Sequence, residues 1–522
     1  MLKSKIPFQN IESIPQLIKD FLNEEIPQFS SYKFSLKNAI SKAEEKSKSF
    51  SKEQRNILVN VFNEQLKTLQ LTDKQSQNIN LLSQESTFTI TTGHQLNLFS
   101  GPVFFIYKIL QTIKTAEYLS QNSDKNFVPV FWMATEDHDF EEINHFRTEQ
   151  NFYQIKGKSG GAVGRIVIED VSFIDEFEKE FKDDVFGTRL ILLMKKSYQK
   201  GKTLTEATRN LVHELFSEFG LLMIDGDDIL LKNQMAEIFS DELQNEVTHH
   251  FSKENVEFLT QKYGKVQVNP REINLFYLSE TRDRISKTEN SYEIVDKDIN
   301  ISFEELAKDW SKISPNALLR PVFQEKVLPN IAYIGGNAEI MYWLELPHVF
   351  ERFKLSFPIL IPRNSMLFLK EKTLKRIDRS GMNLECFLGN FQAKLNEKLV
   401  QESSLKAIIE EKETLLKSQF LELKEKSSLT DKTFRNLVEA EEKRQLKSFE
   451  RMRKRLLRAE KIKQADYIDF LEKLFYEIHP SGNWQERVIN FSNFFAENGD
   501  SWLDNCYQEM DVVNSMLILM EN

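Results

Sequence analysis

The sequence predicts an α/β fold in which a Rossmann-like parallel sheet is followed, near the C-terminus, by a long antiparallel helical hairpin. Two observations predict this class. Strand-like apolar runs alternate with helical segments over most of the chain, which is typical of a parallel sheet covered by helices. From Leu384 onward, apolar residues instead recur at spacings of three and four with charges between them, which is typical of long amphipathic helices.

The first elements predict a βαβ unit. Residues 10–80 show helical apolar spacing and are expected to pack on the core. Residues 87–92, a β-branched and aromatic run, predict a strand, and the nearly all-apolar residues 127–133 predict a second. Between them, Ser100 is expected to be the N-cap of a helix with Pro102 in its first turn. Strand, helix and strand in this order favour parallel, neighbouring strands.

The same alternation continues along the chain. We expect a helix near 204–219, a strand at 221–225, a helix through 228–250, and strands around 331–334 and 357–361. Two stretches depart from this alternation of strands and helices. Residues 147–200 include the glycine-rich segment 156–164 before a strand-like run at 165–168, which predicts a hairpin, and residues 263–312 alternate short strand-like pieces with charged turns. Both are interpreted as insertions into one core.

The last part of the chain is expected to be mainly helical. Apolar stripes through 384–426 and 431–476 predict two helices of about 40 residues, each about 60 Å long, joined at a polar break, Ser427–Asp431. The expected order of segments is N-terminal helices with the first half of the core (1–146), connecting insertion 1 (147–200), core (201–262), connecting insertion 2 (263–312), second half of the core (313–383), coiled-coil hairpin (384–476) and a C-terminal segment packed on the core (477–522).

Composition argues against several classes of function. The net charge is −10, from 69 basic and 79 acidic residues, so nucleic acid and anionic membranes would repel the chain as a whole. No run of about 18 uncharged apolar residues and no signal-peptide pattern is found, so no membrane partner is expected. Because of the net negative charge, no nucleic-acid partner is expected either. Because only Cys386 and Cys506 are present, a disulfide framework is excluded and a reducing, cytoplasmic location is expected.

The first candidate site lies between the first core strand and its helix. Its residues are Thr92, Gly93, His94, Gln95, Asn97, Ser100 and Gly101. In doubly wound folds, ligands bind at the carboxyl ends of the strands, where a helix N-terminus stabilises phosphate or carboxylate. Under this hypothesis His94 and Gln95 lie over that positive pole. The alternative is a tight turn at Gly93 with a purely structural histidine.

The second candidate site directly follows the second strand. Glu136, Asp137, His138 and Asp139 are four titratable groups in a row. At the end of a strand, such groups can supply a general base, a Mg²⁺ ligand or a carboxylate that binds an amine. The alternative is an acidic helix start that complements the helix dipole, although such a start needs no histidine between two aspartates.

The third candidate site combines a strand, a Gly-Gly turn and a helix. Gly335, Gly336 and Asn337 would let backbone approach a ligand, and Glu339 and Tyr342 share one face of the following helix. Residues upstream and after the last strand are expected to face the same crevice: Arg320, Gln324, Arg363, Asn364 and Ser365. The alternative is a simple turn with an aromatic core contact.

Known nucleotide fingerprints are absent from the sequence. It contains neither Gly-x-x-x-x-Gly-Lys-Ser/Thr nor Gly-x-Gly-x-x-Gly, so the residues themselves identify no cofactor. The adjacent histidines His249 and His250 would point in different directions on a helix, and no metal site is assigned to them. The basic run 441–463 lies on the predicted hairpin and is interpreted as a solvated face.

These motifs, taken in order, resemble the cysteine-adding enzyme family of bacillithiol biosynthesis, the BshC family. The resemblance rests on Thr-Gly-His-Gln at 92–95 with Ser-Gly-Pro at 100–102, Glu-Asp-His-Asp at 136–139, Gly-Gly-Asn-Ala-Glu at 335–339 with Tyr-Trp at 342–343, and His-Pro-Ser-Gly-Asn-Trp-Gln-Glu-Arg at 479–487. It covers nearly the whole chain. No single motif is specific, but their order and spacing are.

The resemblance implies a core similar to class I synthetases and nucleotidyltransferases, two connecting insertions, and a coiled coil that forms a homodimer. It also implies a ligase that adds L-cysteine to the amine of glucosaminyl-malate. His94 and Gln95 would fall where such synthetases keep a phosphate-contacting histidine motif, but the usual His-x-Gly-His pattern is missing, and Arg363-Asn-Ser365 stands where a lysine-rich loop is usual. The activating cofactor therefore stays open: ATP or another nucleotide donor with Mg²⁺, an acyl-phosphate, or another donor.

Two other classes of function remain open at this point. A metal-dependent hydrolase would use Glu136–Asp139 as a metal site, and His94 should then approach the same ion. A coiled-coil assembly protein with a relic nucleotide-binding core would lack converging polar groups in the crevice.

Overall fold

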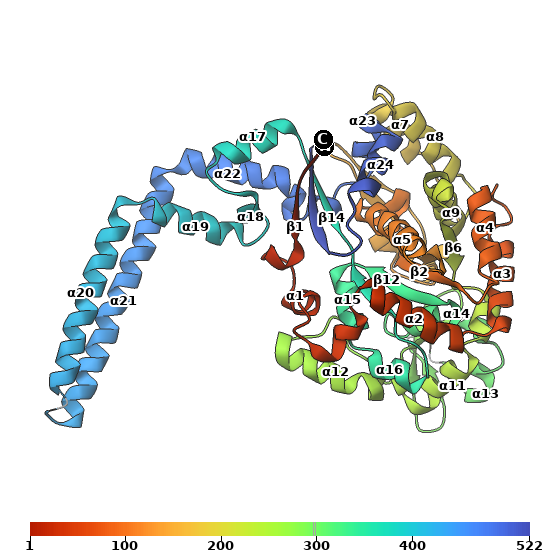
Figure 1. The fold of residues 1–522 in the computed structure, drawn as a ribbon, viewed down its shortest axis with the longest axis horizontal. Coiled ribbons are helices and arrows are strands. Elements are labelled where there is room, and N and C mark those ends of the chain that lie inside the picture. Colours follow the sequence, from red (N-terminus) through yellow and green to blue (C-terminus); the bar gives the residue numbers. More distant parts are fainter. Residues whose placement is uncertain (296, 298, 428, 522) are drawn as a thin grey trace. The chain divides into compact units, whose positions relative to one another are not determined.

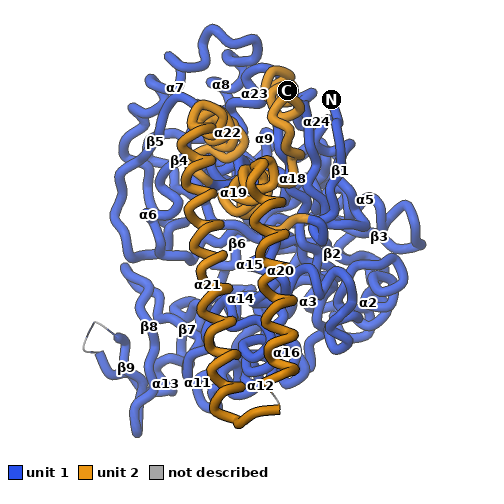
Figure 2. Tube along the Cα trace, turned by 90° about the vertical axis from the view of Figure 1, so that its left-hand side faces the viewer, with its two compact units in different colours: residues 1–10, 14–369, 483–522 blue, residues 11–13, 370–482 orange. Residues whose placement is uncertain are grey.

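The computed structural model describes residues 1–295, 297, 299–427 and 429–521. The chain forms two compact units (Figure 2). Unit 1 comprises Met1–Asn10, Ile14–Leu369 and Asn483–Asn522, and unit 2 comprises Ile11–Ser13 and Lys370–Gly482. Among the described residues, no helix is long and apolar enough to cross a membrane.

The core of unit 1 is a five-stranded, fully parallel sheet (Figure 1). Its strands are β2 (Thr87–His94), β3 (Asn126–Met133), β6 (Leu222–Asp225), β12 (Asn330–Gly335) and β13 (Ile359–Pro362), in the spatial order β13-β12-β2-β3-β6. The chain therefore starts in the middle, builds outward to β6, and then crosses to the other side of β2. The strand order reverses between β2 and β12, which is where open α/β sheets bind ligands. The predicted parallel-sheet core is confirmed.

Helices bury the sheet. The strands β2, β3 and β12 are almost entirely buried, as expected for parallel strands covered on both faces. Helix α5 (Phe104–Gln121) packs on β2, β3 and β12, α2 (Leu36–Ser49) packs on β12 and β13, and α3 (Lys52–Leu66) and α4 (Asp73–Leu81) pack on β6. The expected packing of the N-terminal helices, which also include α1 (Gln16–Leu22), on the core is therefore confirmed.

The other elements of unit 1 surround this core. A second sheet is antiparallel, in the order β10-β9-β8-β7-β11, from β7 (Leu275–Leu278), β8 (Arg282–Lys287), β9 (Tyr292–Ile294), β10 (Ile299–Ile301) and β11 (Ile313–Pro315). Further helices are α6 (Phe140–Ile143), α7 (Phe173–Phe181), α8 (Gly187–Ser197), α9 (Leu204–Phe216), α13 (Phe303–Leu306), α14 (Arg320–Val327), α15 (Asn337–Trp343), α16 (Pro347–Arg352), α23 (Ser492–Asn498) and α24 (Asp500–Glu509).

A third sheet joins the two ends of the chain. Strand β1 (Leu2–Pro7) pairs antiparallel with β15 (Met516–Glu521), which pairs parallel with β14 (Ser365–Leu369). Met1 and Glu521 therefore lie side by side (Figure 1). Sequence analysis did not predict this sheet, because the burial pattern of β1 is mostly exposed and its partner strand lies at the far end of the chain.

The structure corrects the expected start of the first core helix. Helix α5 begins at Phe104 with Val103 at its N-cap and no side-chain cap, so Ser100 is not the cap. Ser100 is buried in a turn where its φ is 68° and that of Gly101 is 62°. Asn490 from the C-terminal segment donates to the carbonyl oxygens of Phe99 and Gly101 at 2.8 and 2.6 Å, and this contact, distant in sequence, covers the turn.

The glycine-rich segment is not a hairpin. Among the described residues, 156–168 form an irregular loop with a 3₁₀ turn at Val163–Arg165, and the short hairpin of this region is β4 (His145–Arg147) with β5 (Phe152–Gln154). Gly164 is needed for close packing of this loop against the segment after β3, not for a hairpin turn. A Cβ at Gly164 would lie 2.7 Å from the Cβ of Thr135, so only glycine lets this loop lie against the segment after β3.

Several predicted helices are interrupted. The predicted helix 228–250 consists of α10 (Ile229–Asn233), α11 (Ala236–Asn245) and α12 (Val247–Tyr263), and the left-handed Glu246, with φ 50°, breaks it. In unit 2, the first long helix is divided into α18 (Leu384–Phe387), α19 (Phe391–Gln401) and α20 (Ser404–Ser427), and the second into α21 (Lys432–Lys463) and α22 (Ala465–Ile478). Helix α17 (Glu371–Arg379) precedes them.

The hairpin itself is confirmed, but it is shorter than predicted. Helices α20 and α21 lie side by side and pack on each other (Figures 1 and 2). With 24 and 32 residues they span about 36 and 48 Å rather than 60 Å. The polar break lies where expected. Asp431 is the N-cap of α21, because its side chain accepts from the backbone N–H of Phe434, while Ser428 lies outside the described residues.

Candidate functional site at the switch point of the sheet

The candidate site is a cavity of about 890 Å³ in unit 1, at the carboxyl ends of β2, β3 and β12. Many of the predicted site residues line it together: Gly93, His94, Gln95, Glu136, Asp137, His138, Asp139, Arg320, Gly336, Glu339, Tyr342 and Arg363. The three candidate sites of the sequence therefore form one cavity. The reason is topological, because β2, β3 and β12 are parallel neighbours and their carboxyl ends meet at one edge of the sheet.

The acidic segment after β3 is held by side chains from two other elements. Gln95 donates from Nε2 to Asp137 Oδ2 at 2.8 Å and to Glu142 Oε2 at 3.0 Å. A guanidinium nitrogen of Arg282 in β8 lies 3.0 Å from His138 Nδ1. Arginine is only a donor, so this Nδ1 accepts, and the proton of the neutral imidazole lies on Nε2.

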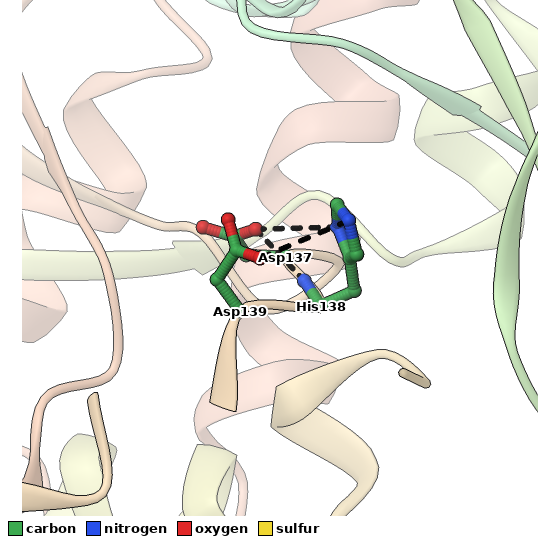
Figure 3. A group of neighbouring side chains, drawn as sticks. All are labelled: Asp137, His138 and Asp139. Atoms are coloured by element: carbon green, nitrogen blue, oxygen red, sulfur yellow. Dashed lines mark hydrogen bonds and ion pairs between the residues drawn. The ribbon is translucent and has the colours of Figure 1, made fainter. Parts of the chain in front are cut away.

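The side chains of Asp137, His138 and Asp139 converge (Figure 3), and one ligand atom from each lies within 4.8 Å of the others. Such a group can hold a metal ion in principle. However, Arg282 brings a fixed positive charge to His138 and uses its Nδ1 lone pair, which opposes cation binding there. The hydrolase hypothesis also required His94 to approach the same ion, but among the described residues His94 is not part of this group of converging ligand atoms.

A buried lysine and a backbone loop also hold the acidic segment after β3 in place. Lys232 of α10 is fully buried and forms ion pairs with Glu136 at 2.7 Å and Asp227 at 2.9 Å. Burial alone would lower the pKa of Lys232, but these two carboxylates raise it, so the lysine stays charged. The glycine-rich loop adds hydrogen bonds from the backbone N–H of Val163 to the Asp137 carbonyl at 2.7 Å and from Gly164 to the Thr135 carbonyl at 2.8 Å. Strand-end carboxylates are thus held in place before any ligand binds.

His94 occupies an apolar position at the end of β2. Its ring packs against Phe104 and Phe105, with centroids 5.2 and 5.1 Å apart, and its Nε2 is buried without a hydrogen-bond partner among the described residues. Burial, together with the charge of nearby Lys108, lowers the pKa of His94 to about 3. His94 is therefore a neutral imidazole at the cavity wall rather than a cationic phosphate ligand.

The depressed pKa of His94 predicts a specific pH dependence of stability. As the pH falls from 6.5 toward 3, the unfolded chain binds a proton at His94 and the folded chain does not, so the free energy of unfolding decreases over this window. We expect the slope of unfolding free energy against pH to become smaller in His94→Gln, because that side chain binds no proton in either state. Urea unfolding between about pH 4 and 6 measures it. Equal slopes for the two proteins would show that His94 titrates normally.

A second ion pair lies beneath the switch point. Lys108 of α5 is buried and donates to Glu339 Oε1 and Oε2 at 3.0 and 2.7 Å, and also to the carbonyl oxygen of Gly93. Glu339 further accepts from Tyr333 and from the backbone N–H of Gly336, both at 2.7 Å. Burial would raise the pKa of Glu339, but Lys108 and these donors lower it to about 2. The pair connects the ends of β2 and β12 across the point where the strand order reverses.

The predicted arginines are already engaged by protein groups. Arg320 donates to Gln324 and Tyr342, both at 3.2 Å. Arg363 forms a buried bidentate ion pair with Glu486, at 2.7 and 3.0 Å. Both guanidinium groups still line the cavity. They therefore contribute positive charge whose orientation the protein has fixed.

Other predicted site residues do not line the cavity. They are Thr92, Asn97, Ser100, Gly101, Gln324, Gly335, Asn337, Asn364 and Ser365. Thr92 donates to the Ile334 carbonyl oxygen within the sheet at 2.8 Å, and Ser365 donates to Glu486 at 3.0 Å. Asn364 contacts the C-terminal segment through the carbonyl oxygens of Asp511 and Asn514. The polar groups of Thr92, Asn364 and Ser365 therefore serve the scaffold.

Sequence analysis did not single out several cavity-lining or supporting residues: Lys108, Lys232, Arg271, Phe276, Arg282 and Arg284. Lys108 and Lys232 follow helical patterns in which a lysine normally faces solvent, so nothing local marks them as buried. The others come from the antiparallel sheet and its approach loop, in the segment interpreted as an insertion. Arg487, which also lines the cavity, ends the last motif that carried the family resemblance.

The fold and the cavity define the class: a Rossmann-like α/β protein with a polar ligand site at the switch point of its sheet and an appended coiled-coil hairpin. Residues 1–364 match the family model of the N-terminal Rossmann-like domain of bacillithiol biosynthesis BshC, and residues 366–521 match that of its C-terminal coiled-coil domain. The chain belongs to the BshC family.

Full-length relatives agree with this assignment. A protein of Flavobacterium johnsoniae is 38% identical over 504 residues, which cover 95% of each chain. One of Flavobacterium psychrophilum is 38% identical over 512 residues, covering 96% of each, and one of Christiangramia forsetii is 34% identical over 514 residues, covering 96% of this chain and 95% of its own. Each is named as a candidate cysteine ligase, BshC.

Proposed function

We propose that this protein is an amide-forming ligase that joins the carboxyl group of L-cysteine to the amine of glucosaminyl-malate, in the cytoplasm. The observation that carries the proposal is the charge arrangement of the cavity. Carboxylates at Glu136, Asp137 and Asp139 line the cavity together with six arginines. Both substrates carry an amino group together with carboxylates, so such a cavity is complementary to both of them.

The amine must lose a proton before it can attack. The nitrogens of His138 are committed, because Nδ1 accepts from Arg282 and Nε2 then carries the ring proton. The carboxylate of Asp137 accepts from Gln95 at Oδ2 and from the backbone N–H of His138 at Oδ1, so each oxygen keeps a lone pair while its orientation is fixed. Asp137 is therefore the best placed base, and Glu136, held by Lys232, adds negative charge that attracts the ammonium form.

A free carboxylate is a poor electrophile, so the reaction needs a donor that activates the cysteine carboxyl group. The residues present fit an anionic donor at the switch point. Gly93 and Gly336 have no side chain to block approach to the backbone, and Arg320 and Arg487 bring positive charge to the same cavity. When bound, such a donor would supply the leaving group, and these residues would orient it.

Genetic complementation tests the function. In a bacillithiol-producing strain that lacks its own gene for this step, the intact chain should restore bacillithiol and deplete accumulated glucosaminyl-malate, as measured by thiol and metabolite profiling. A chain that accumulates at normal levels and restores no bacillithiol would contradict the proposal.

The alternative class, a coiled-coil assembly protein, predicts a different kind of cavity from the one expected for an enzyme. An assembly protein with a relic core was expected to lack converging polar groups, yet titratable side chains from the β2, β3, β8 and β12 regions meet in one cavity. Preorganised ion pairs, such as Lys108 with Glu339, support this cavity. These features favour an enzyme over a purely structural protein.

We also propose that the hairpin mediates homodimerisation. Within unit 2, Phe420, Val438 and Leu456 are buried. Other apolar side chains on α20 and α21 stay exposed, for example Ile408 and Leu415, which are 52% and 51% exposed, and Leu437, which is 61% exposed. Apolar residues at helical spacing on a two-helix hairpin suit a second copy of the same hairpin, which would bury them in a four-helix contact.

This proposal predicts a loss of dimers when the hairpin is shortened. The intact chain should have twice the monomer mass by light scattering, and a chain with residues 390–470 replaced by a short linker should be a monomer. The dimer is expected because burial of the exposed apolar face of the hairpin contributes about 25 cal/mol per Å² to the free energy of association. A monomeric intact chain would rule out the proposal.

A further inference from the structure

The cavity carries positive charge that no described protein group neutralises. Its arginines are Arg271, Arg282, Arg284, Arg320, Arg363 and Arg487. Arg282, Arg320 and Arg363 donate to protein acceptors, as described above. Arg271 and Arg284 form no ion pair and no side-chain hydrogen bond with any other described residue. An exposed arginine commonly lacks a partner, but two of them in one cavity form a local excess of charge.

Arg271 and Arg284 line the same cavity. Partial burial lowers the pKa of Arg271, and the charge of Arg284 lowers it further, so the two guanidinium groups repel each other. Arg271 belongs to the loop that precedes β7, and Arg284 belongs to β8. Like charges held together without a counter-ion cost free energy, which a bound anion would offset.

Strand geometry fixes where Arg284 lies relative to Arg282, the arginine that contacts His138. Arg284 follows Arg282 by two residues in β8, so both side chains point to the same face of the sheet, about 7 Å apart along the strand. Arg282 contacts His138, and its guanidinium stacks on Phe276 at 4.1 Å. Phe276 is the cross-strand partner of Arg284 and lines the same cavity. Arg284 is therefore about one strand repeat from Arg282, which contacts His138, the residue next to the proposed base Asp137.

The spacing of Arg282 and Arg284 along β8 suits the malyl end of glucosaminyl-malate, the proposed acceptor. In glucosaminyl-malate the amine is on the sugar carbon next to the one that carries the malyl group, so its two carboxylates lie within a few ångströms of the reacting nitrogen. With the amine at Asp137, the malyl group can extend along β8 from Arg282 toward Arg284. Two guanidinium groups match two carboxylates in charge, and guanidinium binds carboxylate with two parallel hydrogen bonds.

We infer that Arg271 and Arg284 form the subsite that binds the malyl dicarboxylate of the acceptor, an inference that rests on the proposed function. They determine specificity for an acidic acceptor and take no part in proton transfer. The subsite would bind other small dicarboxylates of similar length, such as L-malate itself, more weakly, because these lack the sugar.

Calorimetric titration of the full chain tests this subsite. The ligands are glucosaminyl-malate, L-malate and methyl glucosaminide, which keeps the amine but has no carboxylate. We expect Kd for glucosaminyl-malate to rise about 10- to 100-fold in Arg271→Gln and in Arg284→Gln, the loss of a charge-assisted contact. L-malate binding should weaken in parallel, and binding of methyl glucosaminide should stay unchanged. Both arginines are exposed, so the variants should fold normally.

Lys265→Gln is the matched control. Lys265 is exposed on the same loop but does not line the cavity, so this variant makes the same charge change without removing a contact. It should bind glucosaminyl-malate like the wild type. Unchanged Kd in the Arg271→Gln, Arg284→Gln double variant, or equal wild-type affinity for glucosaminyl-malate and methyl glucosaminide, would overturn the inference. Arginine-dependent binding by a chain that restores no bacillithiol would instead support the subsite while refuting the proposed function.

Discussion

Asp137→Asn should lower the rate of bacillithiol formation by about 10²- to 10⁴-fold, the range for loss of a general base. The asparagine oxygen can still accept one of the two hydrogen bonds, that from Gln95 Nε2, so the local fold should largely persist. What the variant loses is the capacity to take a proton from the amine and the negative charge that attracts it. The measurement is the initial rate of bacillithiol accumulation in the complemented deletion strain, divided by the abundance of the protein.

Asp124→Asn is the matched control for this prediction. Asp124 has a side chain that is 91% exposed and lies at the opposite end of β3 from the cavity, so the same substitution should leave the rate unchanged. His94→Ala should also be tested, since sequence analysis placed His94 over the positive pole of the first candidate site. Full restoration by both Asp137→Asn and His94→Ala would mean that these strand-end groups are structural and that the site lies elsewhere.

Arg363→Met should lower the free energy of unfolding by about 3–5 kcal/mol, because it leaves Glu486 buried without its partner. The side chains of Arg363 and Glu486 are 4% and 2% exposed, and Ser365 is the other described group that donates to this carboxylate. Urea denaturation of wild type and variant measures the difference. The double variant Arg363→Met, Glu486→Gln should recover much of the loss, because no buried charge remains unpaired.

Arg352→Met provides the comparison for an exposed pair. Arg352 lies 2.7 Å from Asp241, the same distance as in the buried pair, but its side chain is 40% exposed. Solvent screens such a pair, so a loss of about 0–1 kcal/mol is expected. If Arg363→Met were no more destabilising than Arg352→Met, burial would not be what makes the Arg363–Glu486 pair important.

The sequence predicted the parallel core and much of the site for one reason. Burial on both faces makes parallel strands apolar throughout, as in Phe127–Met133, and such runs are visible without a structure. Polar motifs placed directly after these strands, at His94 and at Glu136–Asp139, must then meet at one edge of the sheet. The family resemblance drew on the same motifs, and its assignment is confirmed by the match over both domains.

The tertiary structure decided what each polar residue does, because burial and partners depend on segments far apart in the sequence. Lys108 and Lys232 look like surface lysines in sequence, yet Glu339 and Glu136 hold them in the interior. His94 looks like an anion ligand, yet Phe104 and Phe105 make its surroundings apolar. A strand can be recognised from its own residues, whereas the charge state of a side chain depends on neighbours that only the folded chain brings within a few ångströms.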